Sequence, residues 1–460
     1  MHRVLVRTRS AFTLLPTLLA TCTLLVAALA GPPATANVYF VDAGIAVPSN
    51  GSTWALAMSK IEDAISAASA GDQIFVKAGN YRPDLAFASI DGYVISGKHL
   101  LIYGGFDGTE LTLQQRVGLF DTTVLDAHSN TRCFTILSAS STGTVVIDGF
   151  KIINGEASGS TFGTKGGAIY STDSHLLIGN CVLDHNHAPV NGGGLYFSGS
   201  SETSSWRLNI MLTTFNDNWV NEGKGGAIFG SRMTGGDLVN TVFSQNRVTL
   251  AGDGGAVYLE DMGGANQLRI TNCVYWRNSA NGATAKGGGM CLGETSPTGG
   301  GNVKIVNCTF VGDVVSSSSN GPALSVSANS ICAMHNSILF YNTVNGTQSA
   351  VHTYAGPIAP LTWCDLEGGA FLSNITSPPL FRSVAFANGL TLQNGSPCLD
   401  RADKNQIPDD FLDINGDGLM IGQQVPIDLN KASRDIDWVP ASNLGIPSGT
   451  FVDMGAYEKQ

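Results

Sequence analysis

The chain has 460 residues, a formal net charge of -11 and a hydrophobic fraction of 43%. The hydrophobic fraction excludes a disordered chain, and the negative charge disfavours nucleic acid or an anionic membrane surface as a partner. A single compact core rarely grows to this length, whereas an elongated solenoid can.

Residues 1–36 have the pattern of an export signal. Three arginines stand within the first ten residues, an apolar stretch covers 11–30, and Ala34-Thr35-Ala36 forms a small-x-small cleavage site. The alternative is a membrane anchor, but Pro16 and the cleavage site favour removal. No other stretch is long and apolar enough to span a bilayer. We therefore expect a secreted or cell-surface protein with no transmembrane segment in the mature chain.

Residues 37–82 are predicted to form an N-terminal cap. A strand over 38–42 is followed by an amphipathic helix from Thr53 to Ala70, with Thr53 as the capping residue. Residues 71–76 then give a turn and the first coil strand. The apolar stripe of the helix comprises Trp54, Met58, Ile61, Ala64, Ile65 and Ala68. Such a helix would plug the open end of a stacked fold, which otherwise exposes apolar core and strand edges.

A pattern of the form G-G-A-I-Y recurs through the middle of the chain. Its copies are Gly166–Tyr170, Gly192–Tyr196, Gly225–Phe229, Gly254–Tyr258 and Gly287–Cys291, with a weaker copy at Gly321–Ser325. The copies lie roughly 26 to 34 residues apart, a period typical of solenoids and arrays.

A second pattern, apolar-x-apolar-x-N-[C/T/S]-x-[F/Y/L]-x-x-N, alternates with the first. Its copies end at Asn186, Asn218, Asn246, Asn278 and Asn342, with Asp313 in that place once. Stacking the copies gives three more rows of similar side chains. They are Leu183, Phe215, Phe243, Tyr275, Phe310, Leu339; then Cys181, Thr213, Thr241, Cys273, Cys308, Ser337; then Asn180, Asn240, Asn272, Asn307, Asn336, broken once by Leu212.

These segments are short, β-branched and punctuated by glycine, so each coil is expected to consist of strands joined by turns. One coil cannot bury its own apolar face, and neighbours must therefore stack. Equivalent residues would then lie about 4.8 Å above one another. Asparagine suits the corners because it tolerates left-handed backbone and its amide can bond along the stack.

The paired G-G-A-I and F-x-x-N repeats resemble those of bacterial polymorphic outer-membrane proteins. More broadly, they resemble right-handed parallel β-helix proteins of the pectin-lyase-like superfamily. The resemblance implies an all-β solenoid with coils over residues 83–349, and variable loops at one corner as its binding face. It implies little about activity, because that fold hosts lyases, hydrolases, phage tailspikes and non-catalytic adhesins.

Eight cysteines remain after the predicted signal. Three of them, Cys181, Cys273 and Cys308, share a repeat position with threonine and serine, which favours small side chains in an internal row. Cys273 and Cys308 would lie on adjacent rungs, near enough for a bridge by distance alone. The sequence leaves the pairing of all eight open.

Residues 350–460 are predicted to form a closing domain, because the repeat fades there. The elements Ser396-Pro397-Cys398-Leu399-Asp400 and Asp453-Met454-Gly455-Ala456-Tyr457-Glu458 resemble the choice-of-anchor Q domain, which closes many secreted bacterial β-helix proteins. No sorting tail follows Glu458, so we expect a protein that is released or held non-covalently at the cell surface.

One short motif in this domain predicts calcium. Asp413, Asn415 and Asp417 alternate ahead of Gly418 as in the start of an EF-hand loop, whose oxygens wrap one ion. The twelfth position is Gln424 instead of glutamate, so the full motif fails. An ordinary Asp/Asn/Gly turn is the alternative.

Four aromatic residues are predicted to form an outward row. In each G-G-A-I-Y copy the apolar fourth residue should point inward, so the fifth must point outward. These fifth residues are Tyr170, Tyr196, Phe229 and Tyr258, followed by Cys291 and Ser325. An exposed row would be a stacking platform for a sugar chain lying along the helix axis. The alternative is a row covered by loops or by the C-terminal segment.

Charged residues just before the G-G pairs are the catalytic candidates. A polysaccharide lyase needs a base near the sugar C5 proton and a cation or acid at the uronate carboxylate, and Lys224, Asp253 and Lys286 could supply both on adjacent rungs. His185 is a further candidate. A solvated charge ladder is the structural alternative.

The sequence lacks a close match to the calcium-and-arginine signature of pectate lyases and to the paired aspartates of β-helix polygalacturonases. We therefore predict a secreted or surface protein that binds a polysaccharide or cell-surface glycan without catalysis, with calcium as the one cofactor under consideration. The enzymatic alternative is a polysaccharide lyase or glycosidase of the same superfamily. A structural surface component is the third possibility.

Overall fold

The computed structural model describes most of the chain after the predicted signal. The described residues are 36–88, 91–116, 121–157, 162–201, 205–262, 267–293, 302–317, 321–348, 354–368, 373–385, 387–412, 414, 424–425, 427–431, 433–434 and 452–459. All but the last residue of the predicted export signal lies outside this set. The proposed calcium ligands Asp413, Asn415 and Asp417 lie outside it too, so both the signal and the calcium loop stay predictions.

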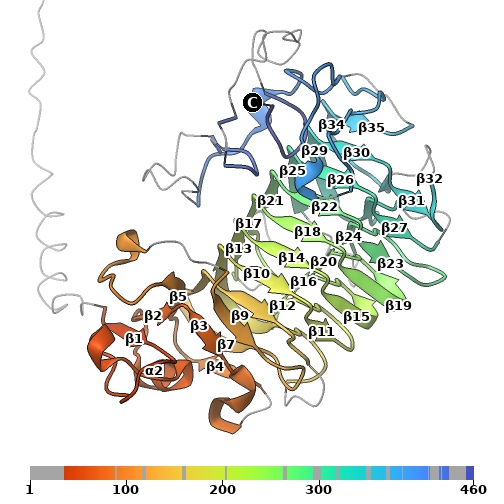
Figure 1. Ribbon diagram of the computed structural model, residues 1–460. Coiled ribbons are helices and arrows are strands. Elements are labelled where there is room, and N and C mark those ends of the chain that lie inside the picture. The colour runs from red at the N-terminus through yellow and green to blue at the C-terminus, as the bar shows by residue number, and fades with distance from the viewer. Residues whose placement is uncertain are drawn as a thin grey trace, which may run out of the picture. The chain divides into compact units, whose positions relative to one another are not determined.

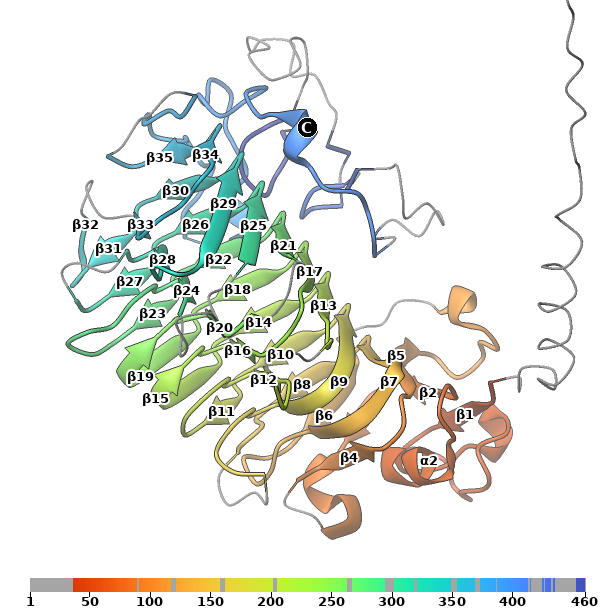
Figure 2. The ribbon, with the colours of Figure 1, turned by 180° about the vertical axis from the view of Figure 1, so that it is seen from behind.

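The described chain forms a right-handed parallel β-helix of about nine turns, as the repeats predicted. Figures 1 and 2 show the coils stacked one above another, with strands of successive coils side by side. Among the named strand pairs only β31–β32 is antiparallel. The described helices are short, and none is long and apolar enough to cross a bilayer.

Three sheets run along the β-helix. The largest sheet has two runs, which the long strands β7 and β9 join. The run that carries the G-G-A-I-Y copies, here called the G-G face, comprises β4 (Tyr93–Ser96), β7 (Phe134–Asp148), β9 (Ile169–Gly179), β12 (Leu195–Ser198), β16 (Ile228–Ser231), β20 (Val257–Glu260), β24 (Met290–Leu292), β28 (Leu324–Val326) and β33 (Tyr354–Ala355). The other run comprises β1 (Val38–Val41), β2 (Gln73–Lys77), β5 (Leu101–Phe106), β13 (Leu208–Met211), β17 (Gly236–Val239), β21 (Leu268–Thr271), β25 (Asn302–Val306), β29 (Ile331–His335) and β34 (Leu361–Thr362).

The two smaller sheets complete each coil. The ten-stranded sheet comprises β3 (Gly79–Tyr81), β6 (Thr123–Asp126), β8 (Lys151–Ile153), β10 (Val182–Asp184), β14 (Thr214–Asn216), β18 (Val242–Ser244), β22 (Val274–Trp276), β26 (Thr309–Val311), β30 (Ile338–Phe340) and β35 (Asp365–Leu366). The seven-stranded sheet comprises β11 (His187–Ala188), β15 (Trp219–Lys224), β19 (Arg247–Asp253), β23 (Ser279–Ala280), β27 (Val314–Val315), β31 (Thr343–Val344) and β32 (Thr347–Gln348).

The predicted inner rows are buried and in register. Phe215, Phe243, Tyr275 and Phe310 stack face to face inside the coils, with centroid separations of 5.3, 4.8 and 4.3 Å. The row of Cys, Thr and Ser side chains is buried as well, and all eight cysteines outside the predicted signal are buried free thiols. This continuous apolar filling is the main core of the molecule.

Two rows of asparagines hold the corners. In the interior of the first row, a side-chain oxygen accepts from the backbone N–H and the amide of the preceding rung, as Asn218 does from Asn186 at 3.1 and 2.9 Å. The second row has left-handed backbone, with φ between 48° and 55° at Asn180, Asn240, Asn272, Asn307 and Asn336. Bonds along the stack also occur in this row, as between Asn272 and Asn240 at 2.9 Å. Both uses of asparagine were predicted.

The second asparagine row also binds the C-terminal segment. Its amides donate to the backbone carbonyls of Asp428, Ile427, Asp453 and Asp403, from Asn240, Asn272, Asn307 and Asn336 in that order. Residues 396–400 and 453–458 meet here, because the Asp400 N–H donates to the Asp453 carboxylate at 2.7 Å. A second apolar cluster packs this segment against the outside of the coils.

The predicted N-terminal helix is shorter than expected. A single helix from Thr53 to Ala70 is wrong, because the segment divides into a 3-10 helix, Trp54–Leu56, and α2, Ile61–Ala67. Thr53 caps the first of these through Leu56 N–H. Residues 57–58 between them are extended. The Met58 N–H donates to the Phe40 carbonyl of β1, and the Met58 carbonyl accepts from the Asp42 N–H just after β1.

The predicted stripe still faces the core in α2, and α2 packs against the first coils. The remaining 3-10 helices are Pro83–Ala88, Leu113–Gln115, Ala387–Gly389 and Lys404–Gln406.

Candidate functional site

The outward aromatic row exists on the G-G face, but it is not an open platform. Tyr170, Tyr196, Phe229 and Tyr258 stand on paired strands, and their rings stack within 8° of parallel at separations of 5.1, 5.1 and 6.0 Å. Tyr196, Phe229 and Tyr258 are only 8%, 4% and 3% exposed. The predicted stacking platform is therefore wrong for these three rings, which pack against one another as a small external core. Tyr170, at the end of the row, is partly exposed.

Basic side chains cover this row. The Lys165 ammonium lies 4.9 Å from the Tyr196 ring centre, and the Lys224 ammonium lies 4.4 Å from that of Tyr258. Both lysines come from the residue just before a G-G pair. A sequence pattern gives the direction of a side chain but not what folds over it, so the direction was predicted correctly while burial of the row stood only as the alternative.

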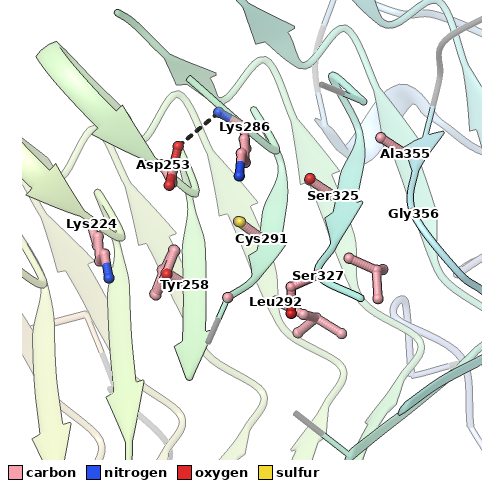
Figure 3. A pocket seen from close by; sticks show the side chains of 12 residues that line it. Lys224, Asp253, Tyr258, Lys286, Cys291, Leu292, Ser325, Ser327, Ala355 and Gly356 are labelled. Carbon is pink, nitrogen blue, oxygen red and sulfur yellow. Dashed lines mark hydrogen bonds between the residues drawn. The ribbon is translucent and has the colours of Figure 1, made fainter. Parts of the chain in front are cut away.

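A cavity of about 540 Å³ opens where the row changes from aromatic to small side chains. Register pairs Tyr258 with Cys291, Cys291 with Ser325, and Ser325 with Ala355 on successive strands. These last three positions carry no ring, and Cys291 and Ser325 are only 2% and 6% exposed. Figure 3 shows the cavity, whose lining residues are Lys224, Asp253, Tyr258, Lys286, Cys291, Leu292, Gly293, Ser325, Val326, Ser327, Ala355 and Gly356.

Three of the predicted catalytic candidates meet at this cavity. Lys224, Asp253 and Lys286 line one border of it, each just before a G-G pair (Figure 3). The glycine after each has positive φ, between 60° and 69°, and an added Cβ there would strike the carbonyl of the residue three positions later. That turn fixes where the charged side chain leaves the backbone. Lys224 pairs in register with Asp253, and hydrogen bonds join Asp253 and its neighbour Gly254 to Lys286, so the three lie on adjacent rungs as predicted.

The charges around the cavity are partly neutralised. The Lys224 ammonium donates to the Glu260 carboxylate at 2.6 Å, and Asp253 accepts from the backbone N–H of Lys286 at 2.9 Å. Burial raises the pKa of Asp253 above its ordinary value, and the positive charges of Lys286 and Lys224 oppose that rise. Among the described residues, the ammonium of Lys286 forms no ion pair. It is therefore the cation best placed for an anionic or polar ligand group.

The remaining polar groups of the cavity are neutral. Burial raises the pKa of the Tyr258 hydroxyl and of the Cys291 thiol well above their ordinary values. A protonated thiol is a poor nucleophile, so Cys291 serves as a small floor residue and not as a reactive one. A Cβ at Gly293 would collide with the Tyr258 hydroxyl, so this glycine is needed for the tyrosine ring to occupy its place.

His185, the fourth catalytic candidate, lies elsewhere. It follows β10, at the corner between the ten-stranded and seven-stranded sheets, and does not line the cavity. Its two ring nitrogens lie 2.7 Å from Asp184 and 2.9 Å from Asp217. The structure thus separates His185 from the other three candidates and places it in a local charge cluster.

Sequence reasoning missed the residues that make the cavity. Cys291 and Ser325 are the small residues that end the outward row, and Glu260 holds Lys224 in place. The signal was present, because the fifth position of the repeat changes from Tyr or Phe to Cys and Ser. This change can be connected with a cavity only once the structure shows that the rings before it are packed against one another.

Comparisons with known proteins show similarity of fold alone. No family model matches the chain, and no curated protein matches it. One solved structure, titled as the crystal structure of pectate lyase Pel9A, is 13% identical over 93% of this chain and 97% of that chain, with a TM-score of 0.40. At that identity and score, the likeness carries no argument about activity.

Proposed function

We propose that this protein is exported and binds carbohydrate in the cavity beside Tyr258, without transforming it. The observation that carries the proposal is the cavity of about 540 Å³ at the end of the outward row, which Lys224, Asp253 and Lys286 border. A concave cavity with a few placed polar groups is the usual form of a small-molecule site, and the volume lies in the usual range.

Each border residue has a separate role in this proposal. Tyr258 forms part of the wall, Asp253 accepts hydrogen bonds from hydroxyl groups, and Lys286 donates to a carboxylate or hydroxyl of the ligand. Lys224 is held by Glu260 and shapes the wall.

Polysaccharide elimination is the second candidate, because the three residues proposed for it line one cavity. Binding is better supported. A base must be free to accept the C5 proton, and the Lys224 ammonium is engaged by Glu260 at 2.6 Å. Asp253 is engaged as well, by the Lys286 backbone.

The first test measures binding by calorimetry against neutral and uronate-containing oligosaccharides. Lys286→Met should weaken binding of the best ligand about ten-fold or more, because one charge-assisted hydrogen bond is lost. Lys151→Met, on β8 of another sheet, is the matched control and should leave the affinity unchanged. Equal affinity of wild type and Lys286→Met would contradict the role of this lysine.

The same oligosaccharides then separate binding from elimination. Each is incubated with the protein at neutral and alkaline pH, with and without calcium, and the ultraviolet absorbance of unsaturated uronides is followed. We expect no such product. Its appearance, with loss in Lys224→Met, would replace the binding proposal by the lyase alternative.

A further inference from the structure

Asp253 belongs to a ladder of polar residues that stand just before the G-G pairs. Backbone pairing aligns Lys165, Asn191, Lys224 and Asp253 on successive rungs, and hydrogen bonds place Lys286 on the rung after Asp253. Lysine therefore alternates with asparagine or aspartate along the ladder. Figure 3 shows the part of the ladder at the cavity, where Asp253 stands between Lys224 and Lys286.

The two residues between lysines make the same hydrogen bond to the next rung. The Asn191 side-chain oxygen accepts from the Lys224 N–H at 2.9 Å, and an Asp253 carboxylate oxygen accepts from the Lys286 N–H at 2.9 Å. Because an amide makes this bond as a carboxylate does, the turn does not require a negative charge. Asn191 does not line the cavity, whereas Asp253 does. The charge thus occurs on the rung where a ligand can meet it.

Among the described residues that line the cavity, Asp253 is the only acidic one. The Lys224 ammonium is paired with Glu260, whereas the Lys286 ammonium forms no ion pair in the described part of the chain. An ionised Asp253 therefore balances the charge of Lys286 and repels an anion. When Asp253 is protonated, Lys286 becomes an unbalanced cation at the border of the cavity.

We infer that Asp253 decides whether this cavity takes a neutral or an anionic ligand. Ionised, it accepts hydrogen bonds from the hydroxyl groups of a neutral sugar; protonated, it admits an anionic group such as a sulfate ester beside Lys286. This inference rests on the proposed function and adds to it a selection between two ligand classes by pH. It makes Asp253 a specificity-determining residue of the cavity.

The surroundings of Asp253 agree with such a change of charge. Burial raises the pKa of Asp253 above its ordinary value, and the charges of Lys286 and Lys224 oppose that rise. Affinity for an anion should therefore rise as the pH falls toward the pKa of Asp253, because the anion binds the protonated form better. Tyr258 and Cys291 face the same space, but burial raises the pKa of both, so they stay neutral in this range.

The test removes the charge of Asp253 and keeps its shape. Asp253→Asn can accept from the Lys286 N–H as Asn191 does from that of Lys224. With inorganic sulfate as the probe in calorimetry, Asp253→Asn should bind at least about five-fold more tightly than wild type at about pH 7.5, and the two affinities should converge at about pH 4.5. Glu260 is present in both proteins, so its own titration cancels in this comparison.

Two control variants connect the effect with the cavity. Lys286→Met should bind sulfate weakly at both pH values, because the cation is lost. Asn191→Asp places the same charge in the same hydrogen bond two rungs away, and should leave the sulfate affinity within about two-fold of wild type. The sugar probes are galactose and galactose 6-sulfate, and wild type should shift its preference toward the sulfated sugar as the pH falls.

The outcomes separate this inference from the proposed function. Equal sulfate affinity of wild type and Asp253→Asn at both pH values overturns the inference, as does an absence of sulfate binding by either protein. Sulfate binding that survives in Lys286→Met also overturns it, since the ion then binds elsewhere. Sulfate binding that follows Asp253 as expected, without binding of any sugar or oligosaccharide, overturns the proposed function alone. Should Asp253→Asn melt well below wild type, equal sulfate affinity of wild type at the two pH values overturns the inference by itself.

Discussion

Two aromatic rows run along this β-helix, one inside the coils and one outside. The inner row passes through Phe215, Phe243, Tyr275 and Phe310 and closes with leucines at both ends. The outer row passes through four rings and then stops at Cys291 and Ser325. Both rows have the same one-strand spacing and nearly parallel rings.

The difference between the rows follows from what can fill a gap. Inside the coils a missing ring leaves a void that nothing else enters, so an inner row must be filled on every rung. Outside, the row of rings ends at Cys291 and Ser325, and a cavity lies beside that end. The same repeat can thus build a core on one side of a strand and border a cavity on the other.

The inner row gives the largest expected effect. Phe243→Ala removes a fully buried ring that stacks on both Phe215 and Tyr275, and should lower the free energy of unfolding by about 3–5 kcal/mol. Phe243→Leu keeps most of the volume and should cost about 1.5 kcal/mol or less. Chemical denaturation of the protein without its signal measures both. A loss below about 1 kcal/mol for Phe243→Ala would show that an inner gap is tolerated.

The outer row should show a smaller but clear loss. Phe229→Ala removes a ring that is 4% exposed and stacked on both sides, and should cost about 2–3 kcal/mol, because water can enter part of the space. An unchanged unfolding energy would mean that the outer rings contribute area without stability. It would also reopen the idea of a platform.

Much of the fold, and part of the site, could be predicted from the sequence. The direction of Tyr258 and the common location of Lys224 and Lys286 follow from a repeat of fixed register, in which each position meets its own copies. The side chains that cover Tyr258 and the cavity beside it do not follow from the repeat, because they depend on how large the side chains of neighbouring rungs are.

Two other features were beyond the repeat altogether. The helix from Thr53 divides because backbone bonding of Met58 to the β1 region competes with helix propensity. The C-terminal segment has no period, so its docking on Asn272 and its neighbours has no signal in the pattern.

The first corner row of asparagines is also interrupted, but here the interruption is an acidic side chain in place of an amide and not a smaller side chain. Asp313 occupies the place of asparagine and keeps its shape, and its Oδ1 accepts from the N–H and the amide of Asn278 at 2.8 and 3.0 Å. In the other rungs the second side-chain atom is an amide that donates, as Asn278 does to Phe243 O. In the described part of the chain, Asp313 Oδ2 is buried without a hydrogen-bond partner.

This interruption gives the smallest and most specific prediction. Burial raises the pKa of Asp313 well above its ordinary value, so folding favours the protonated acid, whose O–H can donate as the amide does. The stability from this group is complete below the unfolded-state pKa and is lost as the pH rises toward the folded-state pKa. Asp313→Asn should therefore equal wild type near about pH 4 and be more stable by about 1–2 kcal/mol near about pH 8. Other buried carboxyl groups are common to both proteins and cancel in the difference. Denaturation of the two proteins at both pH values measures it, and an equal difference at the two would contradict the titration of Asp313.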